Sequence, residues 1–141
     1  MIVTRLIPIV LVAQTLLAVP QLGAQSPSPA DTSRLQDPQD VSIIQLVTNP
    51  NAYDGKVVRL IGFIHFEFEG NAIYLHKEDY DHAITRNGLW VELAAGTSTK
   101  PCENRYAIIE GTFRANDHGH MGMWSGAIRN ITRCDPWIAW H

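Results

Sequence analysis

The sequence has little charge and no excess of basic residues. Eleven Lys and Arg stand against 14 Asp and Glu, the formal net charge is -3, and charged residues make up 18% of the chain. Proteins that act on nucleic acid carry clustered positive charge that neutralises phosphates. The charge balance therefore argues against nucleic acid as a partner. The hydrophobic content of 45% argues against a disordered chain.

Long apolar runs are also missing, except at the start of the chain. Residues 1–5 are short and basic, residues 6–19 are almost wholly apolar, and small residues follow up to Ala24. This order is typical of a secretory signal peptide, and the apolar run is short for a membrane-spanning helix. We expect residues 1–24 to be a signal peptide and the protein to be periplasmic or secreted. An uncleaved membrane anchor is the alternative.

Cysteine occurs only twice, at Cys102 and Cys134. In an oxidising compartment, two cysteines most simply form one disulfide. Closing a loop of about thirty residues would contribute on the order of 3–4 kcal/mol in the chain-entropy model. A pair of metal thiolates is the alternative, but the chain lacks the CxxC spacing that is typical of such sites.

The segment before the expected domain is rich in Ser, Pro, Asp and Gln. Residues 25–38 therefore predict a flexible linker. A helix is expected over Val41–Thr48, with Asp40 as its N-cap and Asn49-Pro50 as its end. Its predicted buried face consists of Val41, Ile44 and Val47, with Ile43 beside it.

Alternation of apolar and polar residues from Lys56 to Glu69 is the strongest structural signal. The apolar parity comprises Val58, Leu60, Ile64, Phe66 and Phe68. This period of two predicts a long half-buried strand, with a bend or bulge at Gly62. Four further strands are expected at residues 72–76, 88–93, 105–115 and 127–133, the last of them bulged.

This inventory predicts a mainly β fold. Helices and strands do not alternate, so a parallel sheet is disfavoured. Five antiparallel strands after one short α-helix suit a small OB-like barrel, which also hides strand edges. We expect the barrel domain to span residues 39–136, followed by an aromatic C-terminal tail at 137–141.

Two stretches carry a resemblance to a known group. Residues 41–50, followed by Tyr53-Asp54-Gly55-Lys56, resemble the opening of small exported bacterial OB-fold-like proteins. In these, a helix that ends in Asn-Pro leads into the first barrel strand. Residues 110–128 are similar to uncharacterised members of such groups. The resemblance covers about residues 40–134. It implies an OB-like fold and an exported setting, but no reaction.

The loop of residues 116–124 has the highest density of potential ligand-binding side chains in the sequence. In an extended chain, His118 and His120 would point to the same side and could share one copper or zinc ion. Asp117, Met121 or Met123 could supply a third ligand. The alternative is a glycine-hinged surface loop whose histidines form hydrogen bonds and whose Met and Trp side chains cap the barrel.

The predicted binding site combines this loop with the polar face of the long strand. Its residues are His65, Glu67, His118, His120 and Trp124. The metal site predicted within it uses His118, His120 and Met121. Copper or zinc would be its cofactor.

Other functions have weaker support. Phe63, Tyr74 and Trp90 could offer stacking platforms for nucleic acid, but the acidic balance opposes that partner. Ser125 stands in a G-x-x-S-G string and not in the G-x-S-x-G elbow of hydrolases, so a hydrolase-like enzyme is least supported. We therefore expect an exported, non-catalytic binding module for a small ligand or an envelope protein. A periplasmic metal-binding protein is the runner-up.

Overall fold

The computed structural model describes residues 37–138. The predicted signal peptide, most of the predicted linker and residues 139–141 lie outside this part. None of the helices within it is long and apolar enough to cross a membrane.

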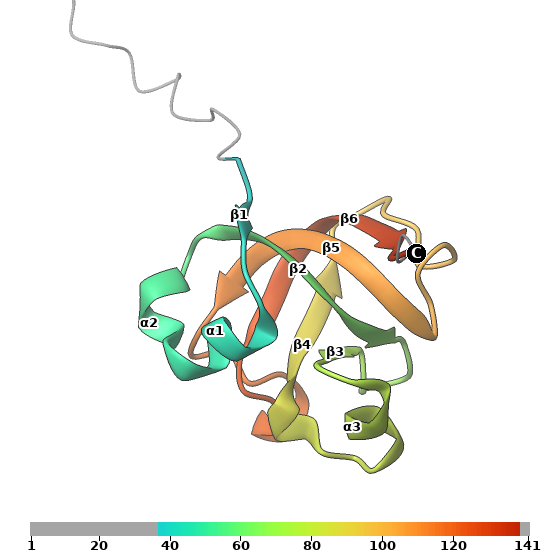
Figure 1. The fold of residues 1–141 in the computed structure, drawn as a ribbon, viewed down its shortest axis with the longest axis horizontal. Helices are drawn as coiled ribbons and strands as arrows, with labels where there is room; N and C mark the ends of the chain where they lie inside the picture. Colours follow the sequence, from blue (N-terminus) through green and yellow to red (C-terminus); the bar gives the residue numbers. More distant parts are fainter. Residues whose placement is uncertain (1–36, 139–141) are drawn as a thin grey trace, which may run out of the picture. The chain divides into compact units, whose positions relative to one another are not determined.

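Five strands close on themselves to form a barrel (Figure 1). They are β2 (Val57–His65), β3 (Ala72–Tyr74), β4 (Gly88–Leu93), β5 (Arg105–Arg114) and β6 (Ala127–Pro136). The strand order is β2–β3–β4–β6–β5, and β5 pairs back with β2. The predicted mainly β fold with an OB-like barrel is thus confirmed. A short strand, β1 (Gln39–Asp40), adds to the outer side of β2.

One barrel pairing departs from the predicted antiparallel arrangement. β4 and β6 run parallel, with Trp90 opposite Ala127, whereas the other four barrel pairings are antiparallel. Parallel neighbours need a long connection, and here the connection contains the whole of β5. This non-local pairing has no signature in the alternation of residues along either strand.

The barrel interior is apolar. Its fully buried side chains include Leu60, Ile64, Leu89, Ile109, Phe113 and Ile128. The predicted buried parity of β2 is therefore correct up to Ile64. The strand ends at His65, however, and Phe68 is 91% exposed in the following turn. In this turn, the backbone N–H of Glu67 donates to the side chain of Asn71 at 3.0 Å, which bends the chain out of the sheet.

Of the bend or bulge predicted at Gly62, the bulge is absent. The register between β2 and β5 runs unbroken past it. Its role is close packing, because a Cβ at this position would lie 2.6 Å from the carbonyl oxygen of Tyr74 and 2.9 Å from Ile43. The bulge predicted in β6 is present. The pairing with β5 shifts between Glu110 and Thr112, and Asn130 adopts a φ of 58°.

Helix α1 (Ile43–Thr48) begins two residues later than predicted. Its N-cap is Ser42, not Asp40, because Ser42 and Gln45 exchange hydrogen bonds in a capping box. The buried face also differs from the predicted one. Ile43 and Leu46 enter the core, and Ile44 is 55% exposed. Asn49 ends the helix as predicted, and Pro50 then opens a short helix, α2 (Pro50–Tyr53).

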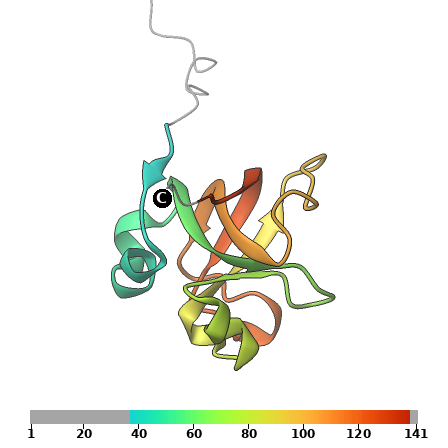
Figure 2. The same cartoon turned by 45° about the vertical axis from the view of Figure 1, so that its right-hand side comes forward.

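Two short elements follow β3. They are α3 (Lys77–Asp81) and the 3-10 turn η2 (Thr85–Asn87). The buried side chain of Asp79 joins them by accepting from the backbone N–H of His76 at 2.9 Å and from the Asn87 amide at 2.8 Å. The β5–β6 connection contains a further turn, η3 (His120–Gly122). Both ribbon views place α3 and this connection at the same end of the barrel (Figures 1 and 2).

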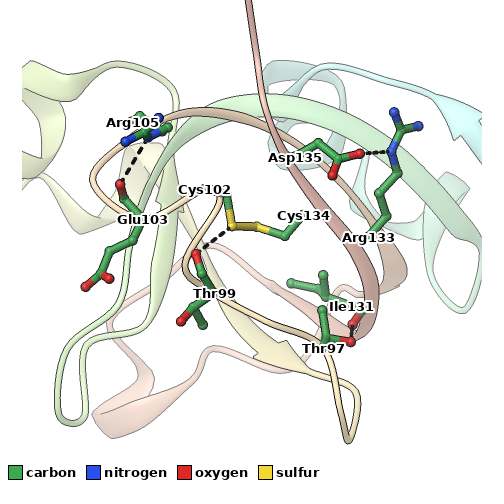
Figure 3. The surroundings of a disulfide bond; sticks show 9 residues. All are labelled: Thr97, Thr99, Cys102, Glu103, Arg105, Ile131, Arg133, Cys134 and Asp135. Atoms are coloured by element: carbon green, nitrogen blue, oxygen red, sulfur yellow. Dashed lines mark hydrogen bonds and ion pairs between the residues drawn. A yellow bond between two sulfur atoms is a disulfide. The ribbon is translucent and has the colours of Figure 1, made fainter.

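Cys102 and Cys134 form the predicted disulfide (Figure 3). Their Cα atoms are 5.8 Å apart, and both residues are buried. The bridge ties the β4–β5 connection to the end of β6. A disulfide in this position fits a compartment that keeps cysteines oxidised.

Candidate functional site

A hollow opens at the end of the barrel that carries α3. It has a volume of about 670 Å³, within the usual range for small-molecule sites. We call it the aromatic hollow and define it by Glu67, Glu69, Tyr74, Tyr80, Asp81 and Trp124, which line it. Phe68 and Met123 stand at its edge, 91% and 38% exposed.

A second hollow of about 450 Å³ borders the first. It is lined by Trp90, Glu92, His120 and Arg129, and it shares Glu69 with the aromatic hollow. Arg129 forms ion pairs with Glu92 and with Asp117. The charges of this second hollow are therefore largely paired within the protein.

Tyr80 is held in the wall of the aromatic hollow by a chain of side-chain contacts. Its hydroxyl lies 3.1 Å from Nε2 of His65, and the centroids of the two rings are 4.3 Å apart. Nδ1 of His65 lies against the side-chain oxygen of Asn104. His65 therefore links Asn104 to the hydroxyl of Tyr80 and fixes the position of the Tyr80 ring.

The opposite wall is built by the β5–β6 connection. Gly119 adopts a φ of +63°, and a Cβ there would lie 2.6 Å from the ring of Trp90, so only glycine allows this approach. The rings of Trp90 and Trp124 meet edge to face at 5.0 Å. Three groups bind the backbone next to Trp124. Arg86 and His118 each donate to its carbonyl, at 3.1 and 3.0 Å, and the Thr85 hydroxyl donates to that of Met123 at 2.9 Å.

Burial and a nearby charge both change the pKa of the Tyr74 hydroxyl in the hollow. Burial raises the pKa of the Tyr74 hydroxyl, and the negative charge of Glu67 adds to that rise. The nearby indole of Trp124 opposes it, although its N–H does not reach hydrogen-bonding geometry. Glu67 therefore places a negative charge close to the Tyr74 hydroxyl in the aromatic hollow.

The predicted binding residues are divided between several places. Glu67 and Trp124 line the aromatic hollow, and His120 lines the neighbouring one. His65 stands behind the wall, 3.5 Å from Glu67. His118 is bound to the Trp124 carbonyl and lines neither hollow. The five residues thus surround one end of the barrel without converging on one point.

The extended backbone assumed for the predicted metal site is absent between His118 and His120. His118 and His120 do not lie in extended chain, because Gly119 turns the backbone and η3 begins at His120. Met121, the tentative third ligand, is 83% exposed. Within residues 37–138, no three His, Cys, Asp or Glu side chains are grouped to hold a metal ion. His118 does donate Nδ1–H to a carbonyl and leaves Nε2 free, an orientation common among ligating histidines.

Sequence reasoning missed Tyr80 and Asn104. Tyr80 had a usable signal, since it is the only aromatic residue in the polar segment 77–87. Asn104 had none, because its contact with His65 spans 39 positions and depends on barrel closure.

No family model, curated protein or solved structure matches this chain.

Proposed function

We propose that the protein is an exported, non-catalytic binding module of the cell envelope or extracellular space, and that the aromatic hollow is its site. The observation that carries this proposal is the hollow itself. Aromatic rings and carboxylates face one volume of about 670 Å³ on a closed barrel. The lining combines aromatic rings with polar groups that could orient a ligand, as in known ligand sites.

Side-chain contacts hold the wall of the hollow in place. Both nitrogens of His65 contact neighbouring side chains, Asn104 and Tyr80, and the histidine orients the ring of Tyr80. Export is supported by the signal-like sequence at residues 1–24 and by the disulfide. Expression in a bacterial host and N-terminal sequencing should find a mature protein that begins near Gln25.

Binding can be tested by NMR on the purified, isotope-labelled protein. The probes are glucose, phenylacetate, 2-phenylethanol and 2-phenylethylammonium, which cover neutral, anionic and cationic chemistry. At least one probe should shift resonances of Tyr74, Tyr80 and Trp124. The substitution Asp81→Trp should fill the hollow and abolish these shifts. Glu78→Trp, on the exposed side of the same helix, is the matched control.

Two outcomes would overturn the proposal. One is that no probe shifts the resonances of the hollow at millimolar concentration. The other is that Asp81→Trp and Glu78→Trp bind equally well.

A further inference from the structure

The carboxylates of the aromatic hollow are only partly compensated within the protein. Asp81 is paired with Lys77 at 2.6 Å. Glu67 and Glu69 are about half exposed, and neither pairs with a lysine or arginine among the described residues. Their ionic contacts there are with His65 and His120, at 3.5 and 3.4 Å, and histidine compensates a charge only when it is protonated.

Basic side chains are absent from the lining of the aromatic hollow in the described part of the chain. Two cations lie close to it, and both are engaged elsewhere. Lys77 binds Asp81, and Arg86 donates to the carbonyl of Trp124. The negative charge of Glu67 and Glu69 is therefore directed to the hollow without a competing cation in its wall.

Aromatic side chains line the same hollow as these carboxylates. The centroids of Tyr74 and Tyr80 are 5.8 Å apart, with their planes at 59°, and Trp124 completes the lining. Phe68 projects from the edge almost fully exposed. The electron-rich faces of such rings attract ammonium and guanidinium groups. Rings and carboxylates together are suited to a cation that carries an apolar body.

We infer that the aromatic hollow binds an organic cation, an ammonium or guanidinium group carried on an apolar or aromatic body. The inference rests on the proposed binding function and names its ligand class. The cation lies against Glu67 and Glu69, and the body contacts Tyr74, Tyr80 and Trp124. The net charge of -3 adds a weak long-range attraction for such ligands.

The test compares three probes of similar shape and different charge. 2-Phenylethylammonium, 2-phenylethanol and phenylacetate are titrated into the labelled protein, and backbone and tryptophan indole resonances are followed. The ammonium should bind at the hollow about tenfold more tightly than the alcohol, and phenylacetate should bind least. Added salt should weaken the ammonium more than the alcohol.

Charge-neutral variants locate the effect. Glu67→Gln and Glu69→Gln should each weaken the ammonium about tenfold and leave the alcohol unchanged. Glu103→Gln removes the same charge from an exposed position outside the hollow and should change neither affinity. Because both target side chains are about half exposed, these substitutions leave the core intact.

The outcomes separate this inference from the proposed function. If the alcohol, phenylacetate or glucose binds at the hollow as well as the ammonium, the cation inference is wrong and the binding function stands. Equal losses with Glu67→Gln and Glu103→Gln would also refute the inference. If no probe shifts the resonances of the hollow, both proposals fail.

Discussion

Breaking the Cys102–Cys134 disulfide should lower the free energy of unfolding by about 3–4 kcal/mol. The two cysteines are separated by 32 positions in the sequence. In the chain-entropy model, a cross-link over such a loop removes about 12 cal/mol/K of entropy from the unfolded chain. At 25 °C this corresponds to about 3.7 kcal/mol, a large share of the 5–15 kcal/mol that is typical of a small domain.

Urea unfolding of the oxidised protein, the reduced protein and the variant Cys102→Ala with Cys134→Ala measures this effect. Reduction breaks the cross-link and keeps both sulfur atoms in the core. The alanine variant also removes sulfur packing, since both residues are buried. The expected order of stability is oxidised, then reduced, then the alanine variant.

The disulfide also stabilises the segment that leads to the binding site. Asn104 follows Cys102 by two positions and contacts Nδ1 of His65. Reduction should therefore broaden or shift the His65 ring resonances at denaturant concentrations where the barrel remains folded. The reasoning would be refuted if reduction lowered the unfolding free energy by less than about 1 kcal/mol. Two free thiols titrated in the unreduced protein would refute the disulfide itself.

Three further predictions concern the barrel and the loop. Burial raises the pKa of Glu110, but hydrogen bonds from Arg133 and Arg59 outweigh this and hold it below the usual 4.5. The ionised Glu110 carboxylate thus stabilises the folded state above that pH, and this stabilisation is lost on acidification. Glu110→Gln should lower the free energy of unfolding by about 1–3 kcal/mol near neutral pH. In thermal or urea unfolding, the difference in this free energy between the variant and the wild type should narrow below pH 4.5. A difference that stays constant with pH would contradict this. Gly62→Ala should lower the unfolding free energy by about 1–3 kcal/mol because its Cβ meets backbone at 2.6 Å; an unchanged urea midpoint would disprove that crowding. Calorimetric titration with Cu(II), Cu(I) and Zn(II) should detect at most weak binding, because two imidazoles alone form an incomplete site. The double substitution His118→Ala with His120→Ala should abolish this binding. Tight binding that survives the double substitution would place the ion elsewhere.

Much of the fold could be predicted from local sequence patterns. The alternation around Val58, Leu60 and Ile64 predicts one face of β2, because adjacent side chains on a strand point to opposite sides. The disulfide also follows from composition and setting. The true start of α1 was present in the sequence as the capping box of Ser42 and Gln45. Asp40 was the wrong choice because it lacks a Glu or Gln three positions later.

The parallel pairing of β4 with β6 and the position of the candidate site follow from closure of the barrel. Tyr80 meets His65 across 15 positions, and His65 meets Asn104 across 39. These contacts exist because the barrel closes and brings separate connections to one end. Local periodicity reports which side of a strand is apolar, but it contains no information about which strands become neighbours. The aromatic hollow therefore emerged only from the folded chain.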